Sequence, residues 1–244
     1  MSSSKLQLQK THDHCAVANP ALTVVLIHGI ASDSSTYDSA LKHLEESTSL
    51  KAVRFVTFDL LGSGKSPKDD SLNYDYKDQL ESLHNSIENL KLTTPLVLVG
   101  HSLGTFIVTR YTATYERSVK HLILISPPVF TPEDLNNPAF AAGIDGFKKT
   151  VNIKKPGIIK EKSFINSMDK IVLDKNNYQT LSSLKTPTTL IYGNADQLIS
   201  SYNIPRLLKD NSNYIKAIKT IGRHGVTHDK YSKLREVLEE ILNA

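Results

Sequence analysis

The chain has 244 residues, of which 22% are charged and 39% hydrophobic, so it is long enough for one large core and typical of globular proteins. Its net charge of +4 is mild and gives no reason to expect a nucleic-acid partner. Cys15 is the only cysteine, which excludes an intramolecular disulfide and fits a reducing compartment.

The sequence contains no stretch with the character of a membrane-crossing helix, because no run approaches 18 apolar residues. Residues 1–10 are polar and lack the apolar centre of a secretory signal peptide. We therefore expect a cytoplasmic protein without a membrane span. The sequence gives no indication of the oligomeric state.

Apolar strands and amphipathic helices alternate along the first half of the chain. Weak alternation over residues 5–18 predicts a short antiparallel pair at a sheet edge. Residues 22–27 and 54–60 are predicted strands, and residues 37–44 carry apolar side chains at helical spacing between them. A second amphipathic helix is predicted over residues 75–91.

The same rhythm continues in the second half of the chain. Strands are predicted at residues 96–99, 121–125, 188–193 and 215–221, and a terminal helix begins near Tyr231. Strands and helices that alternate at this spacing favour an α/β fold with a doubly wound, mainly parallel sheet.

Residues 129–186 break this rhythm. Apolar side chains at helical spacing run through two stretches, one containing Phe140 and Phe147 and the other Phe164 and Met168. The two stretches are joined by K-K-P-G at residues 154–157. We expect a helical insertion between core strands of a single domain that spans the whole chain, residues 1–244.

The G-H-S-L-G sequence at residues 100–104 carries the clearest chemical signal. It follows a buried strand and precedes a run that can continue as a helix. This context predicts a nucleophile elbow, in which Ser102 stands on a sharp turn and two glycines leave room where side chains would collide. The backbone N–H of Leu103 would then face a developing oxyanion.

With four further motifs, the chain resembles the α/β-hydrolase superfamily. H-G-I at residues 28–30 is similar to the family's oxyanion loop, and D-L-L-G-S-G-K-S at residues 59–66 is similar to its D-x-x-G-x-G-x-S turn. G-N-A-D at residues 193–196 follows a predicted strand at the position of the acid, and G-R-H at residues 222–224 matches the histidine loop.

This resemblance implies an α/β-hydrolase fold with residues 129–186 as a small helical cap. It also implies a catalytic triad of Ser102, Asp196 and His224, each just past a predicted strand, with oxyanion donors from the backbone N–H groups of Ile30 and Leu103. The carboxyl ends of parallel strands meet at one crevice, so residues this far apart in the chain can converge.

Two of these assignments have competitors in the sequence. His228 lies only four residues after His224 and could instead be the base, although His224 follows the last strand more directly. Asp196 could cap a helix that begins near Leu198. The remaining polar residues of the motifs, Asp59, His28 and His101, are expected to be structural neighbours of the site.

The resemblance implies a serine esterase, a carboxylic ester hydrolase that cleaves small or medium esters through an acyl-enzyme on Ser102. No cofactor and no metal site is expected. The same residues serve thioesterases, C–C bond hydrolases, perhydrolases and lyases, so the reaction stays open among these. A hydrolase-fold protein that binds a small ligand with little turnover is a separate alternative.

Overall fold

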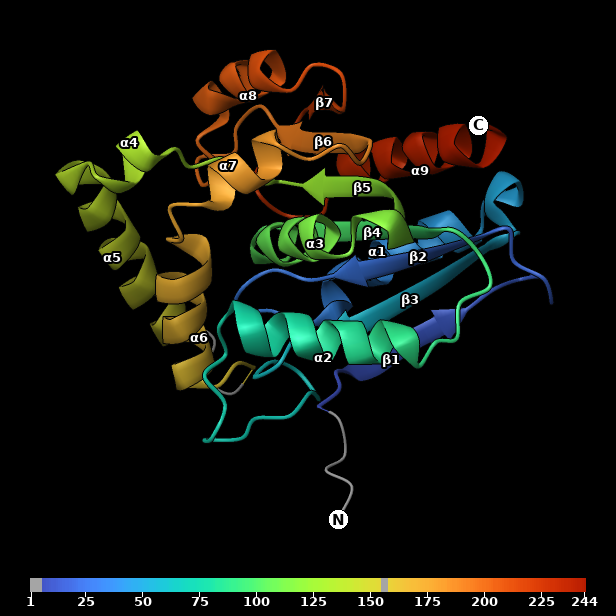
Figure 1. The fold of residues 1–244 in the computed structure, drawn as a ribbon, viewed down its shortest axis with the longest axis horizontal. Helices are drawn as coiled ribbons and strands as arrows, with labels where there is room; N and C mark the ends of the chain where they lie inside the picture. Colours follow the sequence, from blue (N-terminus) through green and yellow to red (C-terminus); the bar gives the residue numbers. More distant parts are fainter. Residues whose placement is uncertain (1–5, 155–157) are drawn as a thin grey trace.

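The computed structural model describes residues 6–154 and 158–244 (Figure 1). In this part of the chain seven strands form one sheet in the order β1-β3-β2-β4-β5-β6-β7. Only β1 runs antiparallel to its neighbour, and all other neighbouring strands are parallel. The predicted α/β class with a doubly wound, mainly parallel sheet is confirmed. The strands are β1 (Gln9–His14), β2 (Leu22–Ile27), β3 (Val53–Asp59), β4 (Leu96–His101), β5 (Val119–Ile125), β6 (Thr188–Gly193) and β7 (Ile215–Thr220).

Helices cover both faces of the sheet, and this explains why the central strands are apolar on both sides. α1 (Asp38–Glu45) and α9 (His228–Asn243) pack on one face through a cluster that includes Leu44 and Leu238. α2 (Tyr76–Glu88) and α3 (Leu103–Thr114) pack on the other face. Every residue of β2 and of β4 is buried, as expected for parallel strands between two helical layers.

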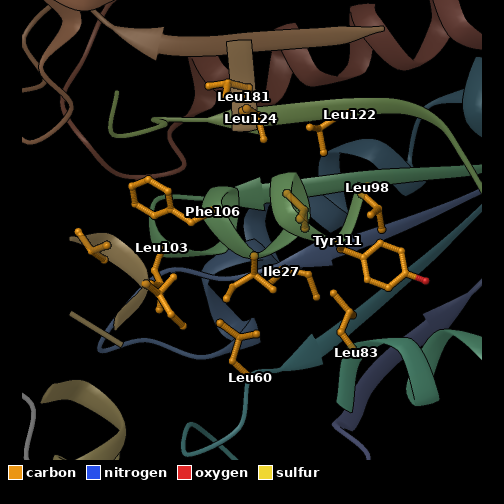
Figure 2. Close-up of a cluster of buried hydrophobic side chains, with 14 of the residues drawn as sticks. Ile27, Leu60, Leu83, Leu98, Leu103, Phe106, Tyr111, Leu122, Leu124 and Leu181 are labelled. Atoms are coloured by element: carbon orange, nitrogen blue, oxygen red, sulfur yellow. The ribbon is translucent and has the colours of Figure 1, made fainter. Parts of the chain in front are cut away.

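Figure 2 shows the core beneath α3. Ile27 and Leu98 of the sheet belong to one cluster with Phe106 and Tyr111 of α3, and Leu181 of α7 (Asn177–Ser182) joins it. α8 (Ile204–Asp210) adds Ile204 and Leu207 to it. The start of α3, directly after the elbow, is therefore fixed by apolar packing on the sheet.

The amino-terminal edge differs from the prediction of an antiparallel pair within residues 5–18. The structure has one strand there, β1, and its antiparallel partner is β3, about 45 residues away in the chain. Two hydrogen bonds of 2.7 and 2.8 Å from Arg54 to Asp13 hold this edge. The weak alternation of apolar residues over 5–18 therefore reflects one edge strand and not two. The strand that pairs with it lies far along the sequence, so the two do not form a hairpin.

Helices fill the segment between β5 and β6. α4 (Pro132–Leu135), α5 (Pro138–Lys154) and α6 (Glu161–Ser167), which continues as a π-helical turn (Met168–Val172), lie beyond the carboxyl ends of the strands (Figure 1). α7 lies instead beside the sheet and packs on α3. The predicted joint at residues 154–157 lies largely outside the described residues.

Among the described residues, the helices are all too short or too polar to cross a bilayer.

Candidate active site

Ser102 occupies a sharp turn between β4 and α3. Its backbone has φ 51° and ψ −116°, in the left-handed half of conformational space that non-glycine residues rarely adopt. A Cβ on Gly100 would lie 2.6 Å from the carbonyl oxygen of Gly104, and one on Gly104 would lie 2.3 Å from that of Ile27. Because backbone fills both places, only glycine lets the helix turn back so closely onto the sheet.

Hydrogen bonds hold this turn in place. The N–H of Ser102 donates to the carbonyl oxygen of Ile125 on β5 at 3.1 Å. The Ser102 carbonyl accepts from the N–H of Thr105 at 2.9 Å and from its hydroxyl at 2.5 Å. The strained backbone is thus supported on both sides, which is what persistence of such a conformation requires.

The structure brings Ser102, His224 and Asp196 together in one hydrogen-bonded chain. The Ser102 Oγ lies 2.8 Å from Nε2 of His224. The other ring nitrogen, Nδ1, lies 3.0 Å from each carboxylate oxygen of Asp196. Since an ionised carboxylate only accepts, Nδ1 carries the proton and Nε2 is free to accept the serine proton.

Asp196 is held as a carboxylate although its side chain is fully buried. Burial acts to raise its pKa, but the hydrogen bond and charge of His224, the N–H of Leu198 and the charge of Lys230 outweigh it. The pKa of Asp196 is therefore lowered. The Leu198 N–H donates to Oδ1 at 3.0 Å, so the local turn that Asp196 makes also orients it.

Lys230 fixes the loop that carries His224. This lysine, in the first turn of α9, is completely buried, and its Nζ donates to the carbonyl oxygens of Arg223 and of Gly225, the latter at 2.8 Å. Burial lowers its pKa, while the charge of Asp196 raises it. Its role could not be predicted from the sequence, because a lysine in an amphipathic helix is normally exposed.

His228 lies elsewhere. It is the first residue of α9, and its ring packs edge-on against Tyr231 at 5.1 Å and near His43 at 5.7 Å. His224 is thus the histidine whose ring meets Ser102. The terminal helix begins three residues before Tyr231, the expected start.

The three structural neighbours expected from the sequence do take part in the local framework. His28 accepts at Nε2 from the Leu60 N–H at 2.9 Å, and Asp59 accepts from two backbone N–H groups at 2.8 Å. His101 donates from Nε2 to the carbonyl oxygen of His224 at 2.9 Å. Burial, together with the charge of His224, lowers the pKa of His101 to about 3, so it stays neutral.

Ile30 and Leu103 both border the space above Ser102. Leu103 is the first residue of α3, where a backbone N–H has no acceptor within the helix. The positive end of the α3 dipole therefore lies at this space. Ile30 follows β2 in the turn after Gly29.

An apolar cavity of about 260 Å³ opens above Ser102 and His224. Phe106 of α3 and Leu198 contribute to its walls, and side chains of α5 and of the π-helical turn also line it. The rings of Phe130 and Phe140 pack edge-to-face at 4.8 Å on this wall. The cavity is larger than the ~150 Å³ apolar cavity that admits benzene, so it can hold a small or medium organic group.

The chain is similar in sequence to several known proteins. Residues 23–157 match the model of the alpha/beta hydrolase fold. The probable lysophospholipase BODYGUARD 5 of Arabidopsis thaliana is 33% identical over 127 residues, which cover 52% of this chain and only 28% of that protein. Lipase 1 of Psychrobacter immobilis is 24% identical over 254 residues, covering 88% of this chain and 77% of the lipase.

Solved structures resemble the chain over nearly its full length. An esterase from Exiguobacterium antarcticum superposes with a TM-score of 0.71 at 19% identity and covers 99% of this chain and 100% of its own. A carboxylesterase of Nitrososphaera gargenis gives a TM-score of 0.74 at 18% identity, covering 100% and 98%. At such identities the likeness concerns the fold alone.

Proposed function

Because the chain belongs to the α/β-hydrolase fold family, we propose that it is a serine hydrolase that cleaves small or medium carboxylic esters. The observation that carries this proposal is the hydrogen-bonded chain from Ser102 through His224 to Asp196, at the floor of an apolar cavity. A protein that only holds a ligand has no need of a serine in contact with a free imidazole nitrogen.

In the first half of the reaction, Nε2 of His224 takes the proton of Ser102 as Oγ attacks the ester carbonyl carbon. The buried carboxylate of Asp196 stabilises the imidazolium that forms. The negative charge on the substrate oxygen is received by the backbone N–H groups of Ile30 and Leu103, each worth about 3 kcal/mol in the transition state. His224 then gives its proton to the departing alcohol, which leaves the acyl group on Ser102.

In the second half, His224 takes a proton from a water molecule, which attacks the acyl-enzyme. The carboxylic acid leaves and Ser102 regains its proton from His224. We propose that α4, α5 and α6 with the π-helical turn act as the cap over this site, because α5 and the π-helical turn supply the upper wall of the cavity. Both halves of the reaction require only these residues and water.

The test combines a covalent probe with matched serine variants. A fluorophosphonate should label the protein at Ser102, located by peptide mass spectrometry, and Ser102→Ala should lower kcat on p-nitrophenyl butyrate about 10⁶-fold. Ser126 offers a control, because it too follows a strand with a φ near 50° and is buried. Ser126→Ala should keep most of the activity. Labelling at another residue, or no turnover of any ester by the wild type, would refute the proposal.

A further inference from the structure

Two glycines interrupt the middle of α5, and packing explains neither of them. A Cβ built on Gly143 or on Gly146 would meet no atom within 4 Å, and both residues have ordinary helical backbone without positive φ. Glycine disfavours a helix interior relative to alanine. The packing of the fold therefore requires a glycine at neither position.

Only one of the two glycines touches the cavity. Gly143 lines it, together with Phe140 and Phe147, which lie three residues before and four residues after it on the same side of α5. Gly146 is not part of the lining and is exposed to solvent. Because Gly143 is also exposed, it marks the place where the cavity wall opens to the surface.

The cavity offers nothing for a charged group to bind. Among the described residues that line it, none is a lysine, arginine, aspartate or glutamate, and apart from the catalytic pair the polar side chains are those of Gln197 and Ser200. A carboxylate or ammonium that entered would lose its hydration without a partner, which is strongly unfavourable. The substrate chain that fills this space must be uncharged.

Building on the proposed function, we propose that the ester cleaved here carries an uncharged apolar chain long enough to cross the cavity from Ser102 to Gly143, and that Gly143 determines the permitted length. The chain runs from Ser102 between Phe140 and Phe147, and the missing side chain at position 143 leaves the gap through which its end passes. A larger residue at this position closes the gap without disturbing the helix.

The test compares Gly143→Leu with Gly146→Leu. Both substitutions replace an exposed glycine of α5 with a good helix former, so their effects on folding match. The readout is kcat/KM for p-nitrophenyl octanoate divided by that for p-nitrophenyl acetate. We expect Gly143→Leu to lower this ratio at least about tenfold, because each methylene excluded from an apolar pocket is costly. Gly146→Leu should change it less than about twofold.

A parallel series of acetate esters with alcohols of two to eight carbons locates the chain. A loss confined to the p-nitrophenyl series places it on the acyl side, and a loss confined to the acetate series places it on the alcohol side. p-Nitrophenyl hydrogen glutarate, whose short chain would leave its carboxylate inside the cavity, should be cleaved at least about a hundredfold less efficiently than p-nitrophenyl pentanoate.

This inference would be overturned if Gly143→Leu left the ratio of long-chain to short-chain kcat/KM unchanged in both series, or if Gly146→Leu changed it equally. The proposed function would still stand in that case, provided that the wild type cleaves p-nitrophenyl acetate. Efficient cleavage of the glutarate would overturn the inference that the chain inside the cavity is uncharged. Failure of the wild type on every ester would instead refute the proposed function itself, so the two failures are distinguishable.

Discussion

The strand ends below the cavity and the helices above it are built under very different constraints. Below, Gly104 is enclosed so tightly that a single added carbon would lie 2.3 Å from a backbone oxygen. Above, Gly143 and Gly146 have empty space where a side chain would be. The position of the serine is thus fixed by backbone contacts that tolerate no change, while the wall that meets the substrate can vary without cost to the fold.

The two regions also differ in their titratable groups. Three histidines with lowered pKa values lie in or directly after sheet strands: His28 and His101, which are buried, and His121, which is half-buried. Residues 129–186 contain no histidine at all. Protonation of histidines in mild acid therefore acts on the stability of the sheet region and not on that of the helical segment.

The largest expected effect separates the two histidines near the last strand. His224→Ala should lower kcat on the order of 10⁴-fold or more, because Ser102 loses the group that takes its proton. His228→Ala should lower it less than about tenfold, since its ring packs on Tyr231 and not on Ser102. Steady-state kinetics on p-nitrophenyl butyrate with both purified variants measures the difference, and a reversed order would make His228 the base.

The next prediction addresses the contrast between the glycines directly. Gly104→Ala should destabilise the protein by about 3 kcal/mol or more, because the new methyl group collides with backbone that cannot move aside. Gly146→Ala should instead stabilise it by up to about 1 kcal/mol through helix propensity. Urea unfolding followed by circular dichroism gives both values. Similar effects of the two substitutions would show that the regions are not constrained differently.

Sequence reasoning succeeded where local chemistry determines structure. The bounds of β6 at residues 188–193 followed from Pro187 and a β-branched apolar run, and the glycines around Ser102 identified the elbow. The edge strand was misjudged because its partner, β3, is distant in the chain. Lys230 could not be found, since nothing in a sequence reveals that a particular helical lysine turns inward to bind carbonyl groups of the preceding loop.

The third prediction uses the acid response of the sheet region. The unfolded chain protonates His101 near pH 6.5, whereas the folded protein keeps it neutral down to about pH 3. Stability is therefore lost as the pH falls through this window, with His101 contributing roughly 1.5 kcal/mol between pH 6.5 and pH 5. His101→Asn keeps an N–H donor but cannot titrate, so its urea midpoint should fall less over that range. An equal fall in both proteins would mean that His101 is protonated in the folded state.

The smallest expected effects distinguish two ion pairs of the helical segment, one with α3 and one within the segment itself. Near its carboxyl end, Asp174 accepts from Arg110 of α3 at 2.9 Å, and both side chains are about three-quarters buried. The Arg110 guanidinium also lies 4.6 Å above the ring of Tyr76, whose hydroxyl donates to Asn177. At the cap surface, Asp169 pairs with Lys148 at 2.5 Å, but almost half of the Asp169 side chain is exposed.

Asp174→Ala should destabilise the protein by about 1 kcal/mol, because it removes a partly buried, charge-assisted hydrogen bond between the segment and α3. Asp169→Ala should cost less than about 0.5 kcal/mol, since water and salt screen an exposed pair. Urea unfolding at low and at high salt measures the loss of unfolding free energy in each variant. Only the loss in Asp169→Ala should vanish at high salt. If the Asp169 pair proved the stronger, surface contacts within the helical segment would stabilise it more than its contacts with α3. The packing of α7 on α3 leads us to expect the opposite.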